Sequence, residues 1–254
     1  MSEPTPPARV LLTGGSGRLG TELRGLLPDL IAPPRAEMDL TEPLSLRRAL
    51  ATYQPALIVH AAAYTDVAGA EVDRAGCWRV NVDGSRQLVA AALASGLPLV
   101  HISTDYVFYG DRGHYQEDDP PGPVRNYYAL TKLVAESLVR LLPRHLVIRT
   151  SFRPRAWPYP VAYGDLYTSQ DYVDVIAPEI ALAVSRFWAI AARGYSTLHI
   201  ATERKSVWEL ARRRSNSVAR GSRLDAERNA GVALPEDVSL DTARWQGLKG
   251  EWKP

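Results

Sequence analysis

The sequence predicts an α/β protein in which helices cover both faces of a doubly wound parallel sheet. Two observations carry this prediction. Short apolar runs, typical of buried strands, alternate with longer segments of helical periodicity, and glycines end the first apolar run. Alternation of this kind favours parallel strands joined by helical crossovers. The 254 residues suffice for one large domain, or for a domain with a smaller lobe.

The elements follow from apolar periodicity and from proline and glycine breaks. Strands are predicted at 9–13, 30–32, 56–60, 97–103, 145–150 and 197–201. Helices are predicted at 17–27, 44–53 (after Pro43), 80–94, 127–142, 173–192 and 207–214, with the fifth broken or started near Pro178. Residues 1–8 are expected to form a flexible tail and 152–171 a long loop, and the polar segment from residue 221 gives no clear pattern.

A glycine-rich turn, TGGSGRLG, joins the first predicted strand to the first predicted helix. Glycine lets the backbone approach a pyrophosphate, and the helix N-terminus offers free N–H groups and partial positive charge. In this strand–turn–helix setting the motif predicts a Rossmann-type site for NAD(P) within residues 9–151. The alternative is a glycine-rich turn without a ligand. The residues expected to bind the cofactor here are Gly14, Gly17, Arg18, Leu19 and Gly20.

The end of the second predicted strand bears on the choice of cofactor. An acidic residue there would bind the ribose 2′-hydroxyl of NAD, but the sequence reads IAPPR. Arg35, with Arg18, is instead suited to a 2′-phosphate. We therefore expect NADPH, with NADH as the alternative, and Arg35 as a solvated loop residue is the competing interpretation.

Tyr128 and Lys132 lie four residues apart in a predicted helix, so they share one face of it. Tyrosine alone has a pKa near 10, and a neighbouring ammonium favours the phenolate. Thr104 follows a predicted strand, at the edge where α/β sheets bind ligands. Together these residues predict a site where Thr104 steadies a reacting oxygen and Tyr128 exchanges a proton with it.

The chain resembles the extended short-chain dehydrogenases/reductases, and among them the dTDP-4-dehydrorhamnose reductase group. The segments that carry the resemblance are TGGSGRLG, MDLTEP, HAAAYTDV, RVNVDGSRQL, HISTDYVF, YYALTKLVAE and HLVIRTS. The resemblance implies an NAD(P)H-dependent reductase of a keto group on a nucleotide sugar, with Tyr128 as proton donor. It also implies that Lys132 holds the cofactor ribose and lowers the pKa of Tyr128.

The same resemblance assigns further positions. Asp39 and Leu40 match the segment that meets the adenine, and the alanines match the stretch beside the phosphates and ribose: Ala61, Ala62 and Ala63. Tyr128 and Lys132 also count among the cofactor-binding residues. The positions expected to contact the substrate are Val67, Tyr106 and Phe152.

The second half departs from the group's pattern. Residues 152–254 are expected to form a small, reduced C-terminal substrate lobe, with elements that return to the Rossmann core. This departure leaves two alternatives open. One is a reductase of a different carbonyl substrate. The other is a non-catalytic NAD(P)-binding regulatory protein that resembles the β subunit of methionine adenosyltransferase.

Composition narrows the remaining classes. The formal net charge of +2 argues against a nucleic-acid binder, and no apolar run reaches the roughly 18 residues of a membrane span. The lone Cys77 excludes an intrachain disulfide and fits a cytoplasmic protein. No spacing of histidine, cysteine or acidic residues predicts a metal site, and a homodimer is possible. The arginines at 212–214, 220 and 223 are expected to lie on a solvated helix face or to bind a substrate diphosphate.

Overall fold

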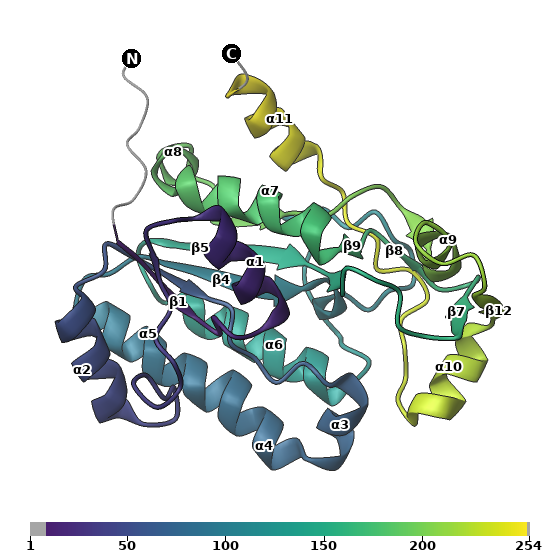
Figure 1. The fold of residues 1–254 in the computed structure, drawn as a ribbon, viewed down its shortest axis with the longest axis horizontal. Coiled ribbons are helices and arrows are strands. Elements are labelled where there is room, and N and C mark those ends of the chain that lie inside the picture. Colours follow the sequence, from purple (N-terminus) through teal and green to yellow (C-terminus); the bar gives the residue numbers. More distant parts are fainter. Residues whose placement is uncertain (1–8, 253–254) are drawn as a thin grey trace.

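The computed structural model describes residues 9–252, and its centre is a parallel sheet of six strands (Figure 1). The strand order is β10-β5-β4-β3-β1-β2, which confirms the predicted doubly wound α/β fold. The tail predicted for residues 1–8 lies outside the described residues. The strands of the sheet are β1 (Val10–Thr13), β2 (Leu30–Ile31), β3 (Leu57–His60), β4 (Leu99–Thr104), β5 (His145–Thr150) and β10 (Thr197–His199).

Helices pack on both faces of this sheet (Figure 1). One face carries α2 (Pro43–Tyr53), α5 (Gly84–Ala94) and α6 (Tyr127–Val139), and the other carries α1 (Arg18–Leu26), α7 (Val173–Ser185), α8 (Phe187–Ala192) and α11 (Ala243–Glu251). Alternating strand residues divide between two cores, so that Leu11 and Ile58 face α2 and α5 while Leu12 faces α1 and α7. Each such buried leucine or isoleucine contributes about 1.5–3 kcal/mol.

The helix predicted at 80–94 begins earlier than the pattern indicated. Asp66 and Asp73 each accept a hydrogen bond from a backbone N–H three residues on, and these caps start α3 (Val67–Val72) and α4 (Arg74–Trp78). A π-helical segment, Arg79–Asp83, then joins α4 to α5. α3 was not predicted from the sequence because it is short and partly exposed, so it has no clear apolar periodicity.

The loop predicted for 152–171 contains four short strands. They are β6 (Phe152–Arg153), β7 (Val161–Tyr163), β8 (Tyr167–Thr168) and β9 (Asp171–Tyr172). β6 pairs with β9, β8 with β11 (Lys205–Ser206) and β7 with β12 (Ala219–Gly221). These strands are not visible in the local sequence pattern, because each is only two or three residues long and pairs with a segment far away in the chain.

The last third of the chain also differs from expectation. α7 continues through Pro178, because Ile176, Ala177 and Ile180 on the same helix are buried in the main core. The second lobe adds α9 (Val207–Arg212) and α10 (Arg223–Ala230), and it lies to the right of the sheet in Figure 1. α10 and α11 fall in the segment that the sequence left unassigned.

Candidate active site

The glycine turn leaves no room for side chains. Gly14 has φ +76°, and a Cβ built on it would lie 2.7 Å from the backbone nitrogen of Ala62. A Cβ on Gly20 would lie 2.2 Å from the carbonyl oxygen of Gly14. Gly17 is the N-cap of α1 and brings no capping side chain to its first turn. The turn therefore sets a bare helix N-terminus against the end of β3, which is a cradle for an anionic group.

Hydrogen bonds fix the end of β3 beside this turn. The N–H of Ala62 donates to Thr13 Oγ1 (3.2 Å), and Thr13 Oγ1 lies 2.8 Å from Nδ1 of His60. Ser85 donates to the carbonyl of Asn81 (2.6 Å), so its oxygen accepts from Nε2 of His60 (2.9 Å). Burial, with the nearby Lys132 charge, lowers the pKa of His60 to about 3. The neutral imidazole of His60, in β3, thus links β1 to α5 through its two hydrogen bonds.

The side chains of the predicted cofactor-binding residues in the turn differ in their exposure to solvent. Arg18 is exposed, whereas the side chain of Leu19 is buried in the main core. Only the backbone of Leu19 is therefore placed to meet a ligand. Ala61, Ala62 and Ala63 are half-buried and follow β3 directly, across from Gly14.

Arg35 and Asp39 form an ion pair of 3.0 Å at the outer rim. Asp39 also accepts from the N–H (2.8 Å) and the hydroxyl (2.7 Å) of Thr41. Burial raises the pKa of Asp39, but the hydrogen bonds from Thr41 and the charge of Arg35 have a larger opposite effect. The pKa of Asp39 is therefore below its ordinary value. The Leu40 side chain is buried under α5. A groove of about 410 Å³ adjoins the pair, lined by Arg35, Thr41, Glu42, Arg79, Asp83, Arg86 and Gln87.

Thr104 and Tyr128 meet at the carboxyl edge of the sheet. Thr104 ends β4, and Tyr128 lies in the first turn of α6, where Asn126 caps the helix by accepting from the N–H of Ala129 (2.9 Å). Tyr128 is buried in a small cluster with Ala70 and Cys77. Val67 and Tyr106, both predicted to contact substrate, pack against the same cluster. The structure therefore brings together four of the residues that the sequence singled out.

The pKa of Tyr128 differs from the sequence-based expectation. Burial and the charge of Asp105 raise this pKa, and a hydrogen bond with Thr104 only partly opposes them. The expected lowering by Lys132 is therefore wrong for the protein without ligands. The buried phenol therefore keeps its proton at neutral pH, which is the form that a proton donor needs, and a neighbouring cation would have to lower this pKa for efficient transfer.

Lys132 turns toward β4 rather than toward the phenol. Its Nζ donates to the carbonyl of Ile102 (2.7 Å) and lies 3.4 Å from Nε2 of His101. Burial lowers the pKa of Lys132 to about 8, although Glu136 opposes the shift. This ammonium, held one helical turn from Tyr128, has donors left for a ligand.

Two residues at this site were not among the sequence candidates. Asp105 accepts from Thr104 Oγ1 (3.1 Å), and burial raises its pKa to about 7 against the effects of Thr104 and Arg153. Asn81, in the π-helical segment, accepts from the N–H of Tyr64 (2.7 Å) and donates to Thr131 Oγ1 (2.9 Å). Asp105 directly follows Thr104 in the segment STDY, and that adjacency was a usable signal.

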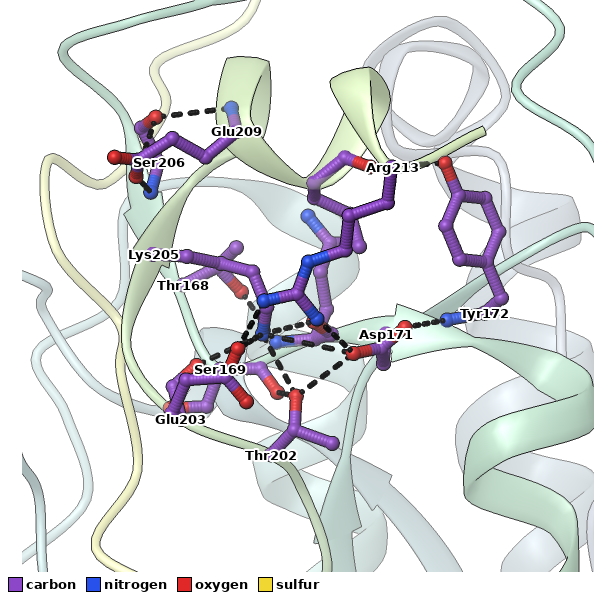
Figure 2. Close-up of polar contacts among 12 residues, drawn as sticks. Thr168, Ser169, Asp171, Tyr172, Thr202, Glu203, Lys205, Ser206, Glu209 and Arg213 are labelled. Atoms are coloured by element: carbon purple, nitrogen blue, oxygen red, sulfur yellow. Dashed lines mark hydrogen bonds and ion pairs between the residues drawn. The ribbon is translucent and has the colours of Figure 1, made fainter. Parts of the chain in front are cut away.

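A charged cluster that includes Asp171, Lys205 and Arg213 joins β9, β11 and the end of α9 in the second lobe. Figure 2 shows the side chains of Lys205 and Arg213 converging on Asp171. Lys205 donates to the carbonyls of Gln170 (3.0 Å) and Glu203 (2.8 Å), and its Nζ lies 3.8 Å from the Asp171 carboxylate. Arg213 bonds Asp171 at 2.9 Å and also pairs with Glu203.

These pairs bear on the predicted basic cluster. Arg213 is neutralised by Asp171 and Glu203, Arg214 by Asp174 (2.8 Å) and Arg223 by Glu227 (2.7 Å). Internal pairing of this kind argues against a diphosphate site at these three arginines. Phe152, the remaining predicted substrate residue, is half-buried and packs against the main core.

Across residues 9–252, no cluster of three or more histidine, cysteine or acidic side chains is arranged to hold a metal ion. No helix in the described part of the chain is long and apolar enough to cross a membrane.

Comparison with known families and curated proteins gives consistent matches. Residues 8–154 match the family model described as RmlD substrate binding domain. A dTDP-4-dehydrorhamnose reductase from Streptomyces griseus is 40% identical over 163 residues, which cover 61% of this chain and 52% of that protein. The enzyme of the same name from Aggregatibacter actinomycetemcomitans is 36% identical over 68% of this chain and 62% of its own length. The chain thus spans little more than half the length of these curated relatives.

Solved structures match over more of the chain. A dTDP-4-dehydrorhamnose reductase from Bacillus anthracis in complex with NADP superposes with a TM-score of 0.83 at 27% identity, covering 96% of this chain and 93% of that one. A hypothetical dTDP-4-dehydrorhamnose reductase from Sulfolobus tokodaii gives 0.80 at 32% identity, covering 94% of each chain. The structural likeness therefore extends into the second lobe, where the sequence likeness to curated relatives fades.

Proposed function

This chain belongs to the family described as RmlD substrate binding domain, and from that premise we propose that it is an NADPH-dependent reductase of a keto group on a nucleotide-activated sugar. The expected substrate is dTDP-4-dehydrorhamnose or a close relative. The observation that carries the proposal is the meeting of Thr104, Tyr128, Val67 and Tyr106 at the carboxyl edge of the sheet.

The glycine turn fits the proposed cofactor. The positions where a Cβ would collide with Ala62 and with the carbonyl of Gly14 make a cradle for a pyrophosphate at the α1 N-terminus. Arg35 is exposed and paired only at the rim, so its guanidinium is free to turn from Asp39 to a 2′-phosphate. The NADP bound to the Bacillus anthracis relative supports NADPH over NADH.

The chemistry divides between the cofactor and this chain's side chains. When bound, the reduced nicotinamide supplies a hydride to the carbonyl carbon. Tyr128 gives its phenolic proton to the carbonyl oxygen, and Thr104 donates a hydrogen bond that holds that oxygen. Lys132 keeps its ammonium within the site to bind ribose hydroxyls. A positioned proton donor contributes about 10²–10⁴-fold to the rate.

The proposal also assigns the parts of the chain. Residues 9–151 form the cofactor domain, and 152–254 form the substrate lobe, from which α7 and α11 return to the core. The reduced size of this lobe, the cytoplasmic location and the homodimer stay predictions.

The direct test mixes purified protein with NADPH and dTDP-4-dehydrorhamnose and follows the absorbance of the reduced nicotinamide. Turnover in the wild type, lost in Tyr128→Phe, supports the proposal. NADPH binding without turnover of this substrate or of a panel of keto sugars contradicts it, and then the non-catalytic alternative stands.

A further inference from the structure

Arg153 is a half-buried cation without a counterion. It is the second residue of β6, where it pairs with Tyr172 of β9. Its Nε is buried and has no hydrogen-bond partner among the described residues. No ion pair within residues 9–252 includes its guanidinium.

Lys132 of the candidate active site likewise has no ion pair among the described residues, whereas two buried cations outside that site have anionic partners. Arg149 pairs with Glu136 at 3.0 Å, with both side chains 1% exposed, and Lys205 lies against Asp171 with all its hydrogen bonds made. A partly buried charge that lacks such a partner costs free energy in the folded state. A cost left uncompensated within the chain points to a partner that arrives from outside.

Arg153 lies three residues beyond Thr150, the residue of β5 that pairs with Thr104 at the carboxyl edge of the sheet. Its charge acts on Asp105 and Tyr106, the two residues that follow Thr104. No ion pair within residues 9–252 joins Arg153 to Asp105, whose carboxyl group instead accepts hydrogen bonds from Thr104 (3.1 Å) and Thr168 (3.5 Å). Arg153 is therefore near the residues that follow Thr104 without being paired to them.

Two aromatic rings lie within cation–π distance of the guanidinium. Its Cζ lies 5.6 Å from the ring centre of Trp157 and 5.9 Å from that of Tyr159. The indole Nε1 of Trp157 is also buried without an acceptor in the described part of the chain. Two donor groups on neighbouring side chains thus lack acceptors on the lobe side of the site.

We propose that Arg153 determines substrate specificity by binding an anionic oxygen of the substrate, at a distance from the carbonyl held by Tyr128 and Thr104. This inference rests on the proposed function and deepens it. Two parts of a nucleotide sugar carry such an oxygen, the diphosphate and a carboxylate on the sugar ring. A planar guanidinium can bind two oxygens of either group at once, and a lysine does not reproduce this geometry.

The experiment measures binding by calorimetry and so requires no turnover. Wild type, Arg153→Gln and Arg153→Lys are titrated with dTDP-glucose and with dTDP-glucuronate in the presence of NADPH. We expect Arg153→Gln to weaken binding by about 10- to 100-fold, as for a lost charged hydrogen bond, and Arg153→Lys to restore only part of it. Equal weakening for both probes assigns the diphosphate, and weakening for the glucuronate alone assigns the carboxylate.

Two controls make the result specific. Arg155→Gln, two residues along, removes an exposed arginine that pairs with Glu22 of α1 and is expected to leave both dissociation constants unchanged. The melting temperature of ligand-free Arg153→Gln is expected to equal or exceed that of the wild type, because the variant no longer buries an unpaired charge.

The outcomes separate this inference from the proposed function. Wild type that binds both probes with Arg153→Gln binding them equally well overturns the role of Arg153 alone. Wild type that binds NADPH but neither sugar nucleotide overturns the proposed substrate class and the role of Arg153 with it.

Discussion

The glycine turn and the charged cluster of the second lobe hold their segments in place by opposite means. At the turn, backbone passes against backbone, and neutral hydrogen bonds from Thr13 and His60 secure it. In the lobe, Lys205, Asp171 and Arg213 join strands that are far apart in the sequence. The turn depends on shape and the lobe cluster on charge, so the two respond to different substitutions and conditions.

The same contrast between the sheet edge and the second lobe applies to the proton donor and to the residue proposed to select the substrate. The proton donor Tyr128 is buried beside the rigid edge of the sheet, whereas the unpaired Arg153 lies in the lobe. A reacting group needs a fixed position, which packing provides. A residue that selects among substrates needs an unsatisfied polar group, and the buried Nε of Arg153 is such a group.

Removing the phenol tests the sheet edge with the largest expected effect. Tyr128→Phe is expected to lower kcat by about 10²–10⁴-fold, because the proton donor is lost. Its melting temperature should stay close to that of the wild type, since the ring still fills the cluster with Cys77 and Ala70. Steady-state kinetics and thermal unfolding measure both. Retention of full activity would contradict the role given to Tyr128.

Removing the lobe cation tests the charged cluster. Lys205→Met is expected to lower the free energy of unfolding by about 3 kcal/mol, because it leaves buried carbonyls and part of the Asp171 charge without a partner. Urea unfolding followed by circular dichroism measures the change. The matched control is Arg228→Gln, which breaks an exposed pair with Asp225 and should cost less than about 1 kcal/mol. Similar losses in both variants would show that the cluster is not a stabilising unit.

A single methyl group tests the turn. Gly14→Ala is expected to destabilise the protein by about 1–3 kcal/mol and to abolish NADPH binding, because its Cβ would collide with Ala62 and φ is positive. Gly96→Ala is the control, since Gly96 also has positive φ but no atom within 4 Å of the added Cβ. Fluorescence titration with NADPH distinguishes the two. Equal NADPH affinities would remove the steric argument for the turn.

The smallest effect concerns the pH dependence of stability. The folded pKa of Asp105, about 7, lies above its ordinary value of 3.8, so the folded state binds more protons in that window. The stabilising contribution of Asp105 should therefore fall as pH rises from about 4 toward 7, by at most about 1.4 kcal/mol per pH unit. Asp105→Asn lacks this titration, so the free energy of unfolding of the wild type minus that of the variant should fall between pH 5 and pH 6 in urea unfolding. Parallel profiles would contradict a buried, protonated Asp105.

Much of the sheet region was predictable because its signals are local. The apolar runs at 9–13, 56–60 and 145–150 match β1, β3 and β5 to within a residue. Thr104 and Tyr128 were predictable as neighbours because parallel strands end, and the helices that follow them begin, at one edge of the sheet. Their pKa values were not, because burial depends on what packs around them.

The second lobe shows the opposite case. β6 to β9 are two or three residues long and pair with distant segments, so no periodicity indicates them. Arg153 reads in the sequence like any other arginine among prolines, and only its missing counterion distinguishes it.

By itself, the sequence determined the α/β order, the glycine turn and the identity of the residues at the sheet edge, because each depends on spacing along a single strand, turn or helix. The tertiary structure alone decided that Lys132 turns to Ile102, that Tyr128 holds its proton and that Arg153 is left without a partner. The physical reason is that protonation and pairing of charges depend on desolvation and on neighbours brought together by folding.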